Sequence, residues 1–388
     1  MIDHKNDFSP AQIEYLQTPI AEELMQQMFE ETNLAKRLKI LRKKLTSDQS
    51  ALLSHQVELK RRGMSKFQQA QKMLFCPEGL EQASAEIVAS HVARRFKNKT
   101  PIVDLTCGIG GDAIALATCG EIIACDIDKS RLMLCRHNLK VHGHQAQLLQ
   151  NDARQNIPEG RSYFIDPARR VAGLHVSQLS QSQPPISAID KALQASNSVA
   201  IKASPALDHR QLPWPCELEV ISVGSECREI VLWLGDMGKK QTTATLLPAG
   251  ISFVGNHEHA APVGEIGAYI YEVNAAIFRA HLLQDLAHHL NLWRIDEQLS
   301  YLTSDEKITS PWLKPYKVLK ILPFSEKRLK KELRLGDFGR IRVKCRSFVG
   351  TEQGWQKRFK SKGKHRAFVF LCRIHQKPIA MICQSCTQ

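Results

Sequence analysis

The stretch DLTCGIGGDA, residues 104 to 113, ends the short apolar run PIVDL and leads into the helical pattern GDAIALA. Gly108, Gly110 and Gly111 permit a tight turn and a close approach of the backbone to a ligand, and the helix start offers unpaired N–H groups. This order of strand, glycine-rich turn and helix predicts a nucleotide-cofactor loop. Gly108, Gly110 and Ala113 also satisfy G-x-G-x-x-A, so a nicotinamide or flavin dinucleotide stays an alternative.

Outward from this loop, short apolar runs alternate with helical stretches up to about residue 244, which is typical of a parallel α/β sheet. The sequence predicts seven strands, at PIVDL, EIIACDID, AQLLQND, SYFID, SVAIKAS, ELEVISVG and EIVLWLG. We therefore expect an α/β domain over residues 99–244. Residues 1–98 are predicted to form a helical N-terminal region and residues 245–388 a small basic α+β domain.

Two further predictions concern helices in the flanking regions. Leucines at spacings of four, three and four residues predict an amphipathic helix, with basic side chains, Arg37 among them, on the rest of its surface. These leucines are Leu34, Leu38, Leu41 and Leu45. After residue 244, AYIYEVNAAIFRAHLLQDLAHHL is expected to contain a helix, and KVLKILPF, SEKRLKKELRL, GRIRVKCRSF and HRAFVFLCRI are expected to be strand, helix, strand and strand.

Four carboxylates follow predicted strands of the α/β region: Asp104, Asp126, Asp152 and Asp166. In open α/β sheets, ligands bind at the carboxyl ends of the strands. A carboxylate at Asp104 suits a cationic amine and sits poorly beside a pyrophosphate, which favours S-adenosylmethionine (SAM) over a dinucleotide. Asp126 is placed to accept hydrogen bonds from ribose hydroxyls, and Asp152 either accepts from the adenine amino group or serves as a turn residue.

The charge is concentrated near the C-terminus. The net charge is +14, and residues 311–377 hold 20 Lys and Arg against 4 Asp and Glu, a local balance of +16. Such a segment favours a polyanionic partner, because neutralised phosphates release counterions, and RNA is the expected partner. A solubilising surface is the alternative.

The remaining composition points to an ordinary globular protein, with 43% hydrophobic and 24% charged residues. The sequence has neither a long apolar run nor a secretory signal, so a cytoplasmic location is expected. The 11 cysteines lack scaffold spacing. The single CQSC pair at residues 383–386 offers too few ligands for zinc, and no metal site is expected.

DLTCGIGGDAIALA, ACDIDKSRLMLCRHNLKVHG and FIDPARR resemble the motifs of class I SAM-dependent methyltransferases. More narrowly, the chain resembles a bacterial group with a C-terminal THUMP-like domain, related to the trimethylguanosine synthase branch. The resemblance covers about residues 66 to 375 and extends to KMLFCPEGLEQAS, VAIKASPALD and ECREIVLW. It implies a seven-stranded Rossmann-like domain, methyl transfer from SAM, and RNA as the substrate class.

The resemblance also implies roles for single residues. The methionine part of SAM would be held by Asp104, Thr106, Cys107, Gly108 and Gly110, the ribose by Asp126, and the adenine by Ile127 and Asp152. The segment CPEGLEQAS would lead into the pocket, so Glu78, Gln82 and Ser84 are further candidates. Lys202 and Ser204, at the end of another predicted strand, either face the substrate or cap a helix.

FIDPARR, residues 164–170, is expected to form the acceptor side of the site, with Asp166, Pro167 and Arg169 as catalytic candidates. Amine methylases of this fold carry Asp/Asn-Pro-Pro-aromatic at such a place. Asp166 can still accept a hydrogen bond from an amine, whereas Arg169 offers a guanidinium plane that stacks on a base or binds phosphate. Because Ala168 and Arg169 replace the second proline and the aromatic residue of that motif, the sequence does not identify the atom that accepts the methyl group. The alternative is an RNA-binding protein that retains the methyltransferase fold without turnover.

Overall fold

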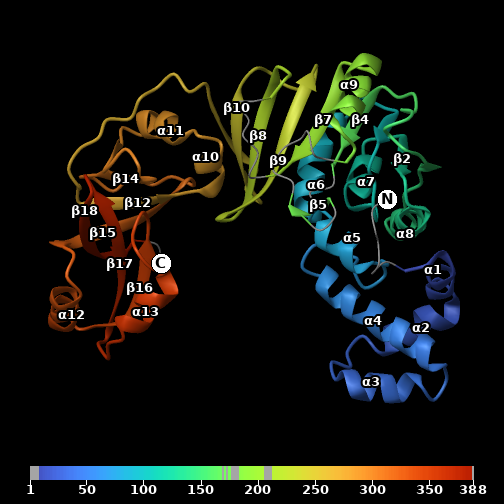
Figure 1. Ribbon diagram of the computed structural model, residues 1–388, viewed down its shortest axis with the longest axis horizontal. Coiled ribbons are helices and arrows are strands. Elements are labelled where there is room, and N and C mark those ends of the chain that lie inside the picture. Colours follow the sequence, from blue (N-terminus) through green and yellow to red (C-terminus); the bar gives the residue numbers. More distant parts are fainter. Residues whose placement is uncertain (1–7, 168–169, 172–173, 176–182, 205–211, 387–388) are drawn as a thin grey trace. The chain divides into compact units, whose positions relative to one another are not determined.

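The computed structural model describes residues 8–167, 170–171, 174–175, 183–204 and 212–386 (Figure 1). The chain forms two compact units, one of Met1–Val223 with Arg228–Gln241 and one of Gly224–Cys227 with Thr242–Gln388. The helices before residue 98 belong to the same unit as the sheet that follows them. The predicted three-part division, with boundaries at 98/99 and 244/245, stays a prediction. No helix within the described ranges is long and apolar enough to cross a membrane.

The N-terminal region is helical, as predicted. Its elements are α1 (Pro10–Leu16), α2 (Pro19–Gln27), α3 (Leu34–Leu41), α4 (Ser47–Gly63), α5 (Pro77–Gln82), α6 (Glu86–Ala93) and the 3-10 helix η1 (Arg94–Phe96). Ser9 and Thr46 begin α1 and α4 with capping boxes, in which each side chain and a glutamine three residues later satisfy one another's backbone N–H groups.

The sheet of the first unit contains all seven predicted strands. They are β1 (Ile102–Asp104), β2 (Ile122–Asp126), β3 (Gln147–Gln150), β4 (Ser162–Ile165), β7 (Ser198–Ala203), β8 (Cys216–Val223) and β9 (Glu226–Gly235). Within a sheet of nine strands, these seven are neighbours in the order β3-β2-β1-β4-β7-β9-β8. The five strands from β3 to β7 are parallel, and β9 is antiparallel to β7. The predicted Rossmann-like seven-stranded domain is confirmed.

Three helices connect these strands and pack on them: α7 (Gly111–Ala117), α8 (Lys129–Val141) and α9 (Ile186–Ala195). Between β4 and α9 the backbone forms a short antiparallel pair, β5 (Arg170–Val171) and β6 (Leu174–His175). From β1 the chain continues to β2 and β3 on one side, and from β4 it continues to β7 on the other side, so the strand order reverses between β1 and β4. The carboxyl ends of β1 and β4 therefore open at a topological switch point, where such sheets bind ligands.

The second unit holds a seven-stranded sheet in the order β13-β14-β12-β15-β18-β17-β16. Its strands are β12 (Tyr269–Val273), β13 (Trp293–Arg294), β14 (Tyr301–Ser304), β15 (Leu313–Pro323), β16 (Phe338–Cys345), β17 (His365–Ile374) and β18 (Lys377–Ser385). Helix α12 (Glu326–Leu335) contributes Leu329 and Leu333 to the core on one face, and Phe359, directly after α13 (Glu352–Arg358), joins them. The strands β10 (Thr242–Leu247) and β11 (Ile251–Gly255) form a hairpin. The predicted α+β character is confirmed.

Two local predictions were wrong. The segment expected to contain one helix after residue 268 forms β12, α10 (Ala275–Arg279) and α11 (Leu283–His289), and His281 between the helices has φ 57°. The leucine-rich helix α3 ends at Leu41, and the Arg37 side chain is 2% exposed. The Arg37 Nε–H donates to Ser54 Oγ at 2.8 Å, and this hydrogen bond links α3 to α4. Arg37 is therefore buried between the two helices and does not lie on a basic surface.

Candidate functional site

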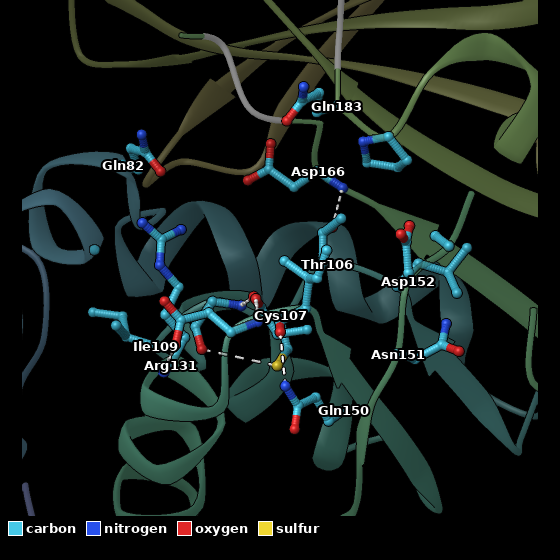
Figure 2. A pocket seen from close by; sticks show the side chains of 18 of the residues that line it. Gln82, Thr106, Cys107, Ile109, Arg131, Gln150, Asn151, Asp152, Asp166 and Gln183 are labelled. Carbon is cyan, nitrogen blue, oxygen red and sulfur yellow. Dashed lines mark hydrogen bonds between the residues drawn. The ribbon is translucent and has the colours of Figure 1, made fainter. Parts of the chain in front are cut away.

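A cavity of about 550 Å³ opens at the carboxyl ends of the parallel strands (Figure 2). Its walls come from the segment before β1, the glycine loop and the ends of β2, β3 and β4. The lining residues are Gly79, Gln82, Ala83, Leu105, Thr106, Cys107, Gly108, Ile109, Gly111, Asp112, Asp126, Ile127, Asp128, Lys129, Arg131, Gln150, Asn151, Asp152, Ala153, Arg154, Asp166, Gln183 and Pro184. Six of the eight predicted cofactor residues are among them. Asp104 and Gly110 are not.

The glycine loop adopts a backbone that favours glycine at two positions. Gly108 has φ 53° and Gly110 has φ 92°. A Cβ atom on Gly110 would lie 3.1 Å from Cys135 Sγ, whereas a Cβ on Gly108 would meet no atom within 4 Å. Gly110 is therefore needed for packing on α8, and Gly108 leaves open space at the cavity wall.

Asp126 shapes this loop from the end of β2. Its Oδ2 accepts a hydrogen bond from the Gly108 N–H at 2.9 Å, and its Oδ1 accepts from the Asp128 N–H at 2.9 Å. Burial raises the pKa of the Asp126 carboxyl. Asp128 is the N-cap of α8 and accepts from the Ser130 N–H at 2.7 Å.

Asp104 lies beneath the loop, and its side chain is buried. Oδ1 accepts a hydrogen bond from the Thr106 N–H at 3.1 Å. Oδ2 has no hydrogen-bond partner in the described part of the chain. Burial, with the neighbouring carboxylates of Asp112 and Asp166, raises the pKa of Asp104 well above its usual range. An unpaired buried carboxyl of this kind fits a positively charged ligand group.

The far end of the cavity is formed by residues that follow β2 and β3 (Figure 2). Ile127 is 47% exposed and offers an apolar surface. Asp152 is bound by Arg154, whose Nη2 lies 2.7 Å from Oδ2, and this hydrogen bond is the main cause of its lowered pKa. Asp152 thus serves as a turn carboxylate, the alternative that the sequence left open, and it also lines the cavity.

The acceptor motif follows β4 directly. The Asp166 N–H donates to Thr106 Oγ1 at 2.7 Å, so this motif and the glycine loop are joined by a hydrogen bond. Asp166 lines the cavity, and Figure 2 shows its carboxylate at the end where Gln82 and Gln183 lie. Pro167 is buried and does not line the cavity. Arg169 lies outside the described residues.

Lys202 at the end of β7 is the residue that sequence reasoning left undecided. Its Nζ lies 2.7 Å from Asp166 Oδ2 and 3.1 Å from Asp112 Oδ2. Its strand-end position, beside the strand that carries Asp166, was the available signal. Of the candidates in CPEGLEQAS, Gln82 lines the cavity, and Ser84 hydrogen-bonds Asp112 and Lys202 instead.

The cysteines near the cavity do not present a reactive thiolate. A hydrogen bond with Cys135 and burial raise the pKa of Cys107, and burial raises the pKa of Cys125 to about 12. Such thiols stay protonated near neutral pH, and they lack the nucleophilicity that a covalent mechanism needs. Within the described ranges, no cluster of three or more His, Cys, Asp or Glu residues could hold a metal ion.

This sheet order and glycine loop define a Rossmann-like domain that binds a nucleoside cofactor. The chain is 30% identical over 307 residues to an uncharacterised SAM-dependent methyltransferase of Mycobacterium tuberculosis, found in strains CDC 1551 and H37Rv. The match covers 78% of this chain and 85% of that relative. This protein therefore belongs to the family of SAM-dependent methyltransferases, and SAM is its cofactor. The carboxylates, the unpaired Asp104 oxygen and the open Gly108 surface fit a ligand with an amine, a ribose and no phosphate.

Two family descriptions match parts of the chain: "RNA cap guanine-N2 methyltransferase" over residues 99–166 and "THUMP domain-like" over residues 313–385. The crystal structure of a candidate methyltransferase from Porphyromonas gingivalis W83 shares the fold, with a TM-score of 0.81 and 19% identity. That match covers 98% of this chain and 100% of the other. The predicted SAM-dependent methyltransferase with a THUMP-like C-terminal region is thus confirmed at the level of family and fold.

Proposed function

We propose that this methyltransferase transfers the methyl group of SAM to a base nitrogen of RNA. The observation that carries the proposal is the position of Asp166. Its carboxylate lines the same cavity as the glycine loop, and its backbone is hydrogen-bonded to Thr106 in that loop. A group bound to Asp166 therefore lies in the compartment that holds the cofactor.

Six of the proposed cofactor roles follow from the cavity wall, and those of Asp104 and Gly110 follow from their positions beside and within the glycine loop. Asp104 would hold the methionine amine through its unpaired Oδ2, with Thr106, Cys107, Gly108 and Gly110 forming the loop around the methionine part. Asp126 would accept hydrogen bonds from the ribose hydroxyls. Ile127 would pack on the adenine, and Asp152 would accept from its amino group while it remains bound to Arg154. The cofactor supplies an electrophilic methyl group on a sulfonium.

A nitrogen acceptor suits the chemistry of Asp166. An ionised carboxylate accepts the N–H of an amine or ring nitrogen and aims its lone pair into the cavity, so that positioning lowers the barrier. The acceptor nitrogen would form its bond to the methyl group as the S–C bond of the cofactor breaks and leaves its electron pair on sulfur, and the nitrogen's proton would pass to Asp166 or to water. Transfer to carbon through a covalent adduct receives no support from Cys107 and Cys125, because both are protonated.

RNA as the substrate class is supported by the second unit. In the basic segment 311–377, every Lys and Arg is exposed except Lys330 and Lys344. THUMP-like similarity over residues 313–385 and the guanine-N2 description over residues 99–166 point to the same class. The relationship to the trimethylguanosine synthase branch stays a prediction, as does the cytoplasmic location.

The test is methyl transfer from labelled SAM to total RNA from cells that lack the gene, followed by mass spectrometry of the nucleosides. We expect one methylated base with the wild-type enzyme and a loss of at least about 100-fold with Asp166→Ala, while calorimetry shows unchanged SAM binding. Asp236→Ala, an exposed aspartate outside the cavity, is the control. SAM binding without label in RNA would contradict the RNA proposal and favour a protein that binds RNA without turnover.

A further inference from the structure

We propose that Lys202 is a positioning residue that fixes the orientation and charge of the Asp166 carboxylate. This inference rests on the acceptor role proposed for Asp166. The parallel pairing of β4 with β7 places Ile165 beside Ile201, so Asp166, directly after β4, and Lys202, inside β7, are the next positions along the two strands. Their side chains meet at 2.7 Å between Nζ and Oδ2.

The Lys202 ammonium is almost completely buried, with 1% of its side chain exposed. Three carboxylates surround it: Asp166, Asp112 at 3.1 Å on α7, and Glu229 at 3.4 Å on β9. A buried ammonium is stable only where it is paired and hydrogen-bonded, and Ser84 Oγ accepts a further hydrogen bond. The Lys202 side chain is therefore held by three carboxylates and one hydroxyl among the described residues.

The pairing leaves one Asp166 oxygen for a substrate. Oδ2 is bound to Lys202, and no residue in the described ranges donates to Oδ1. Asp166 retains 22% exposure of its side chain and lines the cavity. Lys202 thus holds the carboxylate with one oxygen bound and one able to accept an N–H group.

Lys202 also connects the acceptor carboxylate to the cofactor side. The same Nζ binds Asp112, the second residue of the helix that follows the glycine loop. Asp104 lies close enough for the charges of Asp112 and Asp166 to raise its pKa. Without the ammonium, the Asp166 carboxylate would lose the cation that lies between it and the carboxylates of Asp112 and Glu229, and like charges at short distance disfavour the charged form of a carboxyl.

The first test measures the ionisation of Asp166 directly, without any RNA. Protein labelled with carboxyl-13C aspartate is titrated by NMR, and Asp166→Asn identifies the resonance. We expect Lys202→Met to raise the titration midpoint of Asp166 by at least about one pH unit. Lys202→Arg should leave it near the wild-type value. Lys191→Met is the control, because Lys191 donates to the backbone oxygens of Arg154 and Gln155.

The second test measures transfer from labelled SAM to RNA. Lys202→Met should lower kcat at least about tenfold, shift the acid limb of the pH profile upward, and leave the KM for SAM within about threefold. If Lys202→Met does not fold, Lys202→Met/Glu229→Gln restores the charge balance and is compared with Glu229→Gln. An Asp166 midpoint unchanged in the folded variant would overturn the inference. Absence of RNA methylation by the wild type would instead refute the proposed function, and the titration would still decide on Lys202.

Discussion

The backbone N–H of Asp166 donates a 2.7 Å hydrogen bond to Oγ1 of Thr106. Thr106 belongs to the glycine loop and Asp166 to the acceptor motif, and the two segments lie 60 residues apart in the sequence. Both residues follow adjacent parallel strands, β1 and β4, and the hydrogen bond joins the two segments beyond the strand ends. The bond therefore fixes the distance between the proposed methyl-donor side and the proposed methyl-acceptor side. A short distance is required for an in-line transfer.

Thr106→Val is predicted to lower kcat about tenfold. Valine keeps the shape of the side chain but leaves the Asp166 N–H without its acceptor, and an unsatisfied N–H costs about 1–3 kcal/mol. Thr106→Ser keeps the hydroxyl and should retain most of the activity. Single-turnover transfer from labelled SAM measures both variants. Equal rates for Val and Ser would mean that the hydrogen bond does not position Asp166.

Gly108→Ala is predicted to raise the Kd for SAM at least about tenfold, because a methyl group would fill the concave surface left for the cofactor. Gly143→Ala is a matched control: φ is 76° there, and its Cβ also meets no atom within 4 Å. Both variants should lose about 1–2 kcal/mol of stability from the left-handed backbone. Calorimetry and thermal melts compare them, and equal SAM affinities would contradict close approach at Gly108.

The sheet could be predicted from the sequence because its strands are short apolar runs, most of which end at or shortly before an Asp or a Gly. The strand-end carboxylates Asp126, Asp152 and Asp166 were found for the same reason, since parallel strands bring their carboxyl ends to one edge. These signals are local in the chain. A local pattern is enough to predict site residues of this kind, because the parallel sheet brings the ends of its strands together without further contacts.

Contacts between distant segments could not be predicted. Arg37 reads as a surface residue of a basic helix, yet it is buried because Ser54 on α4 accepts from its guanidinium. Lys202 lies in an apolar strand, and its partners Asp112 and Glu229 are far away in the sequence. β18 was missed because KPIAMICQS has no alternation, and both of its faces are buried.

Asp104→Asn is predicted to stabilise the free protein at neutral pH and to weaken SAM binding. The folded-state pKa of Asp104 lies above its usual 3.8, so the folded protein binds more protons than the unfolded chain as pH rises through that value. Its contribution to stability is therefore largest below about pH 4 and is lost toward higher pH. The variant should melt higher than the wild type at about pH 8, with a smaller difference at about pH 5. A SAM affinity unchanged in Asp104→Asn would contradict an amine partner for Oδ2.

Arg340, Arg342 and Arg366 are predicted to contribute to RNA binding. All three side chains are exposed. Arg340 on β16 is paired with Arg366 on β17, and Arg342 lies two residues after Arg340 on β16. The three side chains therefore share one face of the sheet at its edge. Replacing all three by alanine should weaken RNA binding about equally across sequences and reduce the slope of log Kd against log salt by about one for each phosphate that an arginine neutralises. Replacing them by lysine keeps the charge and should keep the slope. Fluorescence anisotropy with labelled RNA between about 50 and 200 mM salt measures both sets. A slope that is the same in the alanine variant would place the RNA elsewhere on the protein.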